Sequence, residues 1–103
     1  MAYEQAGSGP AVVLLHGFVG DAAATWRHQI DALAAYYRVI AWDCPGMGAS
    51  DDPPESFDMG DFADCLAGFV GQPGVQHAHL VGLSFGGTLA LELAVRRPDI
   101  ALT

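Results

Sequence analysis

The stretch "HLVGLSFGG", residues 79–87, decides the fold class because it holds a serine between two glycines. An aliphatic run leads into Ser84, and a run with helical spacing follows it. This is the pattern G-x-S-x-G between a strand and a helix, which raises a serine hydroxyl above a sheet. So sharp a bend requires a strained backbone at Ser84. Gly82 and Gly86 suit the bend because strand and helix pass too closely there for a Cβ atom.

Outward from this bend, strand-like and helix-like segments alternate. Continuous apolar runs typical of buried strands cover residues 11–17, 38–43 and 77–84, and residues 3–7 are expected to add an edge strand. Helical spacing predicts amphipathic helices over residues 24–37, over 59–70 with Asp58 as the cap, and over 85–97 up to Pro98. Strands alternating with helices pair in parallel. The predicted class is α/β, with a mostly parallel sheet of three or four strands and three helices.

Composition limits the classes of function. The chain has 103 residues, 51% of them hydrophobic, and a formal charge of −8. This length fits one domain, and the acidic balance excludes nucleic acid and anionic membranes as partners. Residues 1–10 lack the basic and apolar regions of a signal peptide. Two isolated cysteines without metal-binding spacing favour a reduced, cytoplasmic protein.

Three motifs in order resemble the N-terminal part of an α/β-hydrolase: "VVLLHGF" (12–18), "AWDCPGMGASD" (41–51) and "LVGLSFGG" (80–87). The resemblance implies a single, truncated domain over residues 1–103, a partial α/β-hydrolase fold whose C-terminal half is missing. It implies a nucleophilic Ser84 in a nucleophile elbow and an oxyanion hole formed by the backbone N–H groups of Phe18 and Phe85. It implies no metal or organic cofactor. Dehalogenase-like and epoxide-hydrolase-like members carry Asp at the elbow, so the serine separates this chain from them.

A catalytic base for Ser84 is harder to find. The family order is Ser, acid, His, yet only Asp99 and no histidine follows the serine. Asp99 comes after a helix, roughly 20 Å from the serine at 1.5 Å per residue. His79 lies roughly 16 Å back along the strand at about 3.3 Å per residue, and His77 lies further still. Hydrogen-bond reach is about 3 Å, so none of these residues can act as the base.

The remaining candidates near the expected site have structural interpretations. His16 ends its strand beside the site, and we expect it to hold the oxyanion loop rather than to take a proton. His28 lies off the apolar stripe of its helix and is expected in solvent. Asp43 is interpreted as a turn former whose side chain holds the loop that follows. Cys44 is interpreted as a buried, unreactive thiol. The aromatic residues Trp26, Trp42, Phe57 and Phe62 could line a pocket, but core packing is the preferred interpretation at these spacings.

The sequence therefore predicts half of a catalytic apparatus. The full enzyme would be a serine hydrolase acting on a small-molecule ester, thioester, lactone, amide or activated C–C bond through an acyl-serine. We expect the 103-residue chain alone to be inactive. One alternative is a non-catalytic remnant or partner-binding fragment, and another is assembly with a separate chain that supplies the histidine. The strand at residues 77–84 should have an unpaired outer edge that allows self-association.

Overall fold

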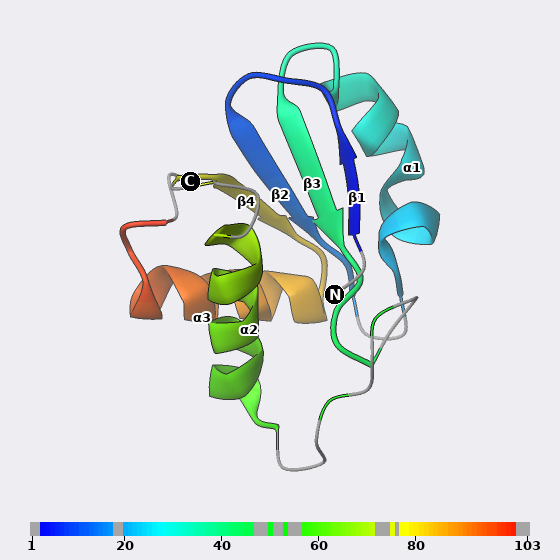
Figure 1. Cartoon of the computed structure of the whole chain (residues 1–103). Coiled ribbons are helices and arrows are strands. Elements are labelled where there is room, and N and C mark those ends of the chain that lie inside the picture. Colours follow the sequence, from blue (N-terminus) through cyan, green and yellow to red (C-terminus); the bar gives the residue numbers. More distant parts are fainter. Residues whose placement is uncertain are drawn as a thin grey trace.

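A computed structural model of the chain describes residues 3–17, 20–46, 50, 53, 57–71, 75 and 77–100. They form one four-stranded sheet with helices on both faces (Figure 1). The strands are β1 (Tyr3–Ala6), β2 (Ala11–Leu15), β3 (Arg38–Trp42) and β4 (His79–Gly82). The helices are α1 (Ala22–Leu33), α2 (Met59–Gly71) and α3 (Phe85–Arg96). The predicted α/β class, the edge strand at the N-terminus and the three helices are confirmed.

The sheet is mostly parallel, in the order β1-β3-β2-β4. β2 lies in the middle and pairs in parallel with β3 and with β4, whereas β1 pairs with β3 in antiparallel. The carboxyl ends of the three parallel strands therefore meet at one edge of the sheet. That edge carries Ser84, and it is where ligands bind in open parallel sheets.

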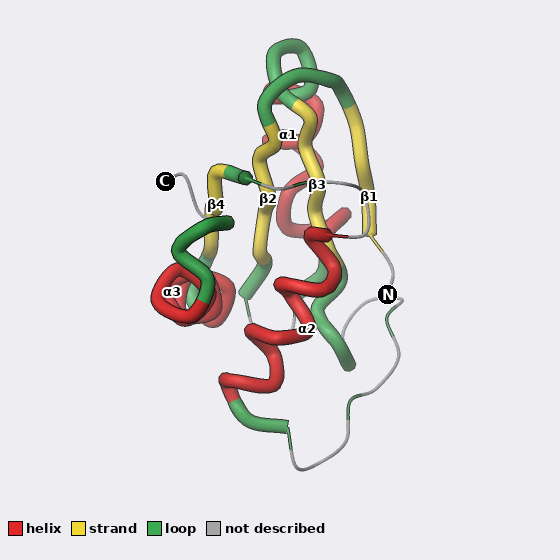
Figure 2. The backbone as a smooth tube through the Cα atoms, turned by 60° about the vertical axis from the view of Figure 1, so that its left-hand side comes forward, coloured by secondary structure: helices red, strands yellow, loops and turns green. Residues whose placement is uncertain are grey.

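Two apolar clusters hold the layers together, one on each face of the sheet (Figure 2). α1 covers β1, β3 and β2 on one face, where Trp26 and Ile30 pack over Val12 and Leu14. α2 and α3 cover the other face with the larger cluster, which contains the fully buried Trp42. The core role expected for Trp26 and Trp42 is thus confirmed.

The helix starts have side-chain caps. The carboxylate of Asp21 accepts a hydrogen bond from the Ala24 N–H at 2.7 Å, so α1 begins at Ala22 rather than at residue 24. At α2, Asp58 accepts from the Asp61 N–H at 2.9 Å and Asp61 accepts from the Asp58 N–H at 3.0 Å. This reciprocal pair is a capping box with aspartate at both positions, and it confirms Asp58 as the cap.

α1 ends earlier than its apolar spacing predicts. Its last residue is Leu33, and residues 34–36 form a turn rather than a continued helix. The Leu33 carbonyl accepts from the N–H groups of Tyr36 and Tyr37 at 3.0 and 2.9 Å. The chain must reverse here because Arg38 already pairs with the Pro10 carbonyl, at 3.0 Å, to open β3.

β4 is not the fully buried strand that its composition predicts. Val81 is 41% exposed and the following Leu83 is 53% exposed. Among the described residues β4 pairs only with β2, and α1 does not reach it, so one face and one edge of β4 lack cover. The unpaired edge agrees with the sequence, while self-association through it stays a prediction.

None of the helices within the described residues has the length and apolar character that crossing a bilayer requires.

Candidate active site

Ser84 occupies the bend between β4 and α3. It is the N-cap residue of α3, with φ 55° and ψ −114°. Among the described residues it is the only one other than glycine with a positive φ. An L-residue in this region costs on the order of 1–3 kcal/mol. The serine is exposed, and its side chain makes no capping hydrogen bond, so the fold does not use the hydroxyl to close the helix.

Backbone hydrogen bonds on both sides of the serine fix the bend. The Leu83 N–H donates to the Leu15 carbonyl at 3.0 Å, which extends the β2–β4 pairing beyond the last strand residue. The Gly86 N–H then donates to the Leu83 carbonyl at 2.9 Å, and the Thr88 N–H donates to the Ser84 carbonyl at 3.1 Å. The backbone hydrogen bonds therefore change from the strand pattern to the helix pattern within two residues.

The glycines on either side of the serine are required by close backbone contacts. A Cβ atom on Gly86 would overlap the carbonyl oxygens of Leu15 and His16. A Cβ atom on Gly82 would overlap the backbone of Gly86. Backbone atoms cannot move aside as the end of a side chain can, so the expectation from the sequence is confirmed for both glycines.

The loop after β2 faces the serine. A Cβ atom built on Gly17 would lie 3.5 Å from the Ser84 Cβ and 3.3 Å from the Leu83 carbonyl oxygen. Phe18, the predicted donor of the first oxyanion N–H, follows Gly17 but lies outside the described residues. Phe85, the predicted second donor, is the first residue of α3. The N-terminal end of a helix is where backbone N–H groups and the helix dipole favour negative charge.

His16 is buried beneath this loop, 1% exposed, and both of its ring nitrogens have partners. Nε2 accepts from the Cys44 N–H at 2.9 Å, which places the proton on Nδ1, and Nδ1 then donates to the Gly17 carbonyl at 2.7 Å. With both ring nitrogens engaged in these hydrogen bonds, the ring has no free acceptor for the serine proton. The histidine instead links the end of β2 to the end of β3. Its contact with the Gly17 carbonyl agrees with the expected role of holding the loop after β2.

Asp43 is a structural residue whose side chain contacts the start of α1. One carboxylate oxygen accepts from the Ala22 N–H at 2.8 Å, at the start of α1. Its main chain contacts the segment that follows, since the Ser50 hydroxyl donates to the Asp43 carbonyl at 2.5 Å. The N–H groups in the first turn of a helix need acceptors, and this carboxylate supplies one. Residues 47–49 of the loop that the side chain was expected to hold lie outside the described residues.

The two thiols are not nucleophiles in this setting. Cys44 is fully buried, and burial raises the pKa of its thiol to about 12. Partial burial, together with the nearby Asp61 and Asp64, also raises the pKa of Cys65. Thiolate is the reactive form, so both cysteines are held in their unreactive form near neutral pH. Within the described ranges, no group of three His, Cys, Asp or Glu side chains could hold a metal ion.

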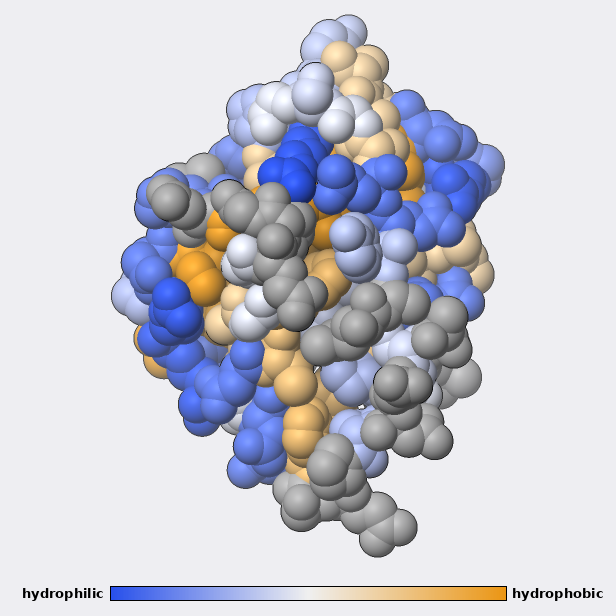
Figure 3. Space-filling view, viewed as in Figure 1, coloured by the Kyte–Doolittle hydropathy of each residue, from blue (hydrophilic) through white to orange (hydrophobic). Residues whose placement is uncertain are grey.

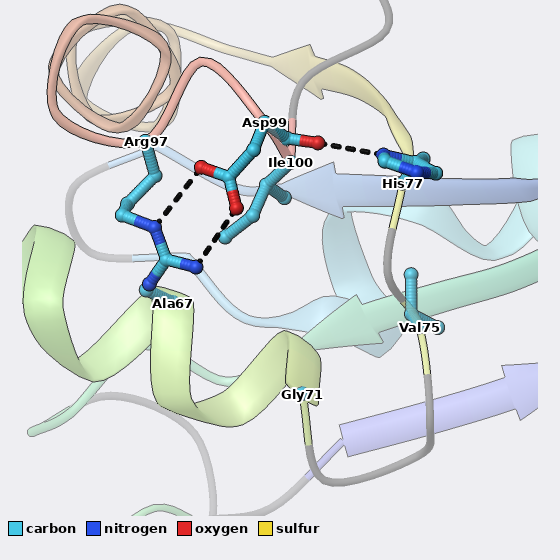
Figure 4. Close-up of a pocket in the computed structure, with 7 residues that line it drawn as sticks. All are labelled: Ala67, Gly71, Val75, His77, Arg97, Asp99 and Ile100. Atoms are coloured by element: carbon cyan, nitrogen blue, oxygen red, sulfur yellow. Dashed lines mark hydrogen bonds and ion pairs between the residues drawn. The ribbon is translucent and has the colours of Figure 1, made fainter.

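The other candidate bases and acids lie away from the serine. His77 and Asp99 line a cavity of about 340 Å³ beside the C-terminal ends of α2 and α3 (Figure 4). The His77 Nδ1 donates to the Asp99 carbonyl at 2.6 Å, and Arg97 binds the Asp99 carboxylate at 3.0 Å and lowers its pKa. His79 opens β4, at the opposite end of that strand from Ser84, and His28 is exposed on α1.

The described residues thus place the serine at the elbow but bring no imidazole to it. A cluster of aromatic residues beside the elbow was not predicted from the sequence. Phe57 and Phe62 are half-buried, and Phe62 packs against the core cluster as expected. The ring of Phe62 contacts that of Phe57 and also that of Phe85. The only sequence signal for this cluster is the proximity of Phe62 to the start of one helix and of Phe85 to the start of another.

Alanine at position 86 is expected to destabilise the protein by roughly 3 kcal/mol or more, because its Cβ meets two main-chain carbonyls. The matched control is Gly68→Ala in α2, where a Cβ has no neighbour within 4 Å. That change should stabilise by about 0.5–1 kcal/mol through helix propensity. Urea unfolding of both variants measures the difference. Equal stability of the two variants would contradict the close approach at the elbow.

Substitution of His16 by alanine should cost roughly 2–4 kcal/mol, because it leaves the buried Cys44 N–H without an acceptor and opens a cavity. Glutamine, which offers both a donor and an acceptor, should recover part of the loss. Chemical denaturation of His16→Ala and His16→Gln measures this order. If the two variants are as stable as the parent, the histidine bridge contributes nothing.

Alkylation should distinguish the two cysteines. At pH 8 iodoacetamide should modify Cys65 slowly and Cys44 only after unfolding. Burial blocks access of the reagent to Cys44 and keeps its thiol protonated. Intact-mass spectrometry in the presence and absence of urea follows the reaction, and Cys65→Ser isolates Cys44. Rapid native labelling of the Cys65→Ser variant would show that Cys44 is accessible.

Comparison with known proteins agrees with this geometry. The model of the alpha/beta hydrolase fold family matches residues 10–101. The chain is 38% identical over 102 residues to a dihydrolipoyllysine-residue acetyltransferase component of an acetoin cleaving system from Cupriavidus necator. That match covers 98% of this chain and 27% of the relative. A putative carbamate hydrolase from Pantoea ananatis is 38% identical over 89 residues, covering 85% of this chain and 32% of the relative.

Solved structures show the same relationship. A meta-cleavage product hydrolase from Pseudomonas fluorescens IP01 superposes with a TM-score of 0.90 at 37% identity, covering 96% of this chain and 38% of that one. The chain therefore spans about a third of the length of the proteins it matches, and it corresponds to part of their fold. With a strand–serine–helix elbow in a mostly parallel sheet and a family match over nearly its whole length, the chain belongs to the α/β-hydrolase family.

Proposed function

We propose that Ser84 is the nucleophile of a serine hydrolase that cleaves small-molecule carbonyl substrates. The observation that carries this proposal is the conformation of the serine, with φ 55° at the N-cap of α3. Strain at a residue that glycine would relieve is typical of functional positions. The hydroxyl caps no helical N–H, so the fold gains no hydrogen bond there that would explain the serine.

The chemistry follows from the position of the serine. The Ser84 Oγ would add to the carbonyl carbon of the substrate, the π electrons of the C=O bond moving to oxygen. The N–H groups of Phe85 and Phe18 would donate to that oxyanion at the helix N-terminus. The oxyanion then collapses, the leaving group departs with a proton, and water hydrolyses the acyl-serine. The base that carries the proton would come from residues other than the four histidines of this chain.

The relatives support hydrolysis as the reaction class and leave the bond open. The names of the similar proteins include a carbamate hydrolase, epoxide hydrolases and an enzyme that degrades N-acyl homoserine lactone. Epoxide-hydrolase-like members carry Asp at the elbow, so Ser84 favours acyl transfer over epoxide opening. We propose an ester, thioester, lactone, amide or activated C–C bond as the target. No metal ion is needed for this mechanism.

A fluorophosphonate probe tests the nucleophile directly. The folded chain should gain one phosphonyl group at Ser84, faster than a short serine peptide does, because the oxyanion donors act without the base. A site stripped of its triad residues can keep roughly 10³-fold catalysis over water. Intact-mass and fragment mass spectrometry measure the rate and the position.

Two variants make the labelling result specific. Ser84→Ala should abolish labelling, whereas Ser8→Ala removes an exposed serine outside the site and should leave labelling unchanged. A folded chain that reacts no faster than the peptide would contradict the proposal. That outcome would favour the non-catalytic role, in which the chain at most binds a partner.

A further inference from the structure

Three phenylalanine rings form a continuous cluster that reaches the residue after the nucleophile. The rings of Phe57 and Phe62 have centroids 5.2 Å apart at an interplanar angle of 89°. The rings of Phe62 and Phe85 follow at 5.6 Å and 86°. Both contacts are edge-to-face, the arrangement that aromatic rings prefer at about 4.5–7 Å. Phe85 adjoins Ser84 in the chain, so one end of the cluster lies at the elbow.

The cluster remains partly open to solvent, unlike the core beneath it. Phe57, Phe62 and Phe85 are each of intermediate burial, whereas Leu66 and Phe69, further along α2, are 0% and 2% exposed. Phe62 lies in the first turn of α2 and Phe85 opens α3, so the rings gather where the two helices begin. Figure 3 shows hydrophobic residues reaching the surface along the α2 side of the molecule, between hydrophilic ones.

The charge around the cluster restricts what it would accept. Asp58 and Asp61 cap α2 within a turn of Phe62, and the carboxylate of each accepts the backbone N–H of the other. Hydrogen bonding between the two caps lowers the pKa of Asp58. The chain as a whole carries a formal charge of −8. The rings offer no hydrogen bond to an anion, so burying an anionic substrate group against them would cost free energy, whereas a neutral aromatic or branched alkyl group would not.

We propose that Phe57, Phe62 and Phe85 form a subsite for a neutral, apolar group attached next to the scissile carbonyl. The inference rests on the proposed function of Ser84 and names its substrate class: arylalkyl or bulky alkyl carbonyl compounds. The substrate group adds a further edge-to-face or stacked contact to the rings. Phe62 lies in the middle of the cluster and contacts both other rings, so it determines the preference.

A pair of phosphonate probes measures the preference during reaction. One probe carries a benzyl group on phosphorus and the other a short ethylene glycol chain. In both, the Ser84 Oγ–P bond forms, the P–F bond breaks, and fluoride and a proton enter the solvent. The benzyl probe should label Ser84 at least 10-fold faster. Phe62→Ala should reduce the ratio to within about 3-fold, mainly by slowing the reaction with the benzyl probe.

Binding without reaction provides the second measurement. In the Ser84→Ala variant, methyl phenylacetate at millimolar concentration should shift the backbone NMR signals of residues 57, 62 and 85. Methyl methoxyacetate, its polar match, should not. Phe57→Ala serves as a second variant in case Phe62→Ala does not fold. Tyr36→Ala removes a ring that is 76% exposed after α1 and should change neither measurement.

The two measurements separate the two proposals. Binding at the cluster without any labelling would overturn the nucleophile and keep the subsite. Labelling at equal rates by both probes, with no shifts from methyl phenylacetate, would overturn the subsite and keep the nucleophile. Neither labelling nor binding would overturn both. Shifts that persist in both Phe→Ala variants would place the apolar ligand elsewhere and overturn the subsite.

Discussion

The architecture of the site depends on one close approach, that of the first turn of α3 to the carboxyl end of β2. Gly86 lies against the carbonyl oxygens of Leu15 and His16, so the helix begins directly above the central strand. This contact sets how sharply the chain must turn after β4. It therefore forces Ser84 into its positive φ and aims the start of the helix at the space above the sheet. Packing of the backbone, rather than any side-chain bond, positions the serine.

A hydrogen-bonded network then joins the ends of the two central strands. His16 links the β2 exit to the Cys44 N–H after β3, and Asp43 links the same end of β3 to the start of α1. These bonds fix the residues on which the loop after β2 rests. A buried polar network of this kind is useful only when every member is satisfied, and the ring of His16 is satisfied at both nitrogens. His16 therefore contributes to the site by joining the ends of two strands and not by acting as a base.

Much of this could be predicted from the sequence, because the elbow is a local feature. A glycine two residues before and two after a serine, between a strand and a helix, determines a bend whatever surrounds it. The burial of β4 could not be predicted in the same way, since it depends on which strands lie beside it. The partner of the Asp43 side chain depended on the exact start of α1. The sequence named Phe57 and Phe62 as possible pocket residues, but their association with Phe85 could not be predicted because it depends on how α2 packs against α3.

The sequence also predicted correctly that no histidine of this chain would meet the serine. Strand direction was sufficient for His77 and His79, because each residue that precedes the elbow along an extended chain lies about 3.3 Å further from Ser84. His16 required the structure, since its position in sequence allowed either role. Its two hydrogen bonds decide between them, whereas the donor assigned to Phe18 lies outside the described residues and stays a prediction.

The positive φ at Ser84 sets stability against chemistry, because the residue that would best fit this backbone conformation carries no hydroxyl. Glycine would relax that conformation and recover about 1 kcal/mol, but it carries no hydroxyl. A library selected for heat resistance alone would therefore drift toward glycine at this position and lose the hydroxyl that we propose as the nucleophile. Improvement of this scaffold by directed evolution would need a screen that rewards acyl transfer in every round.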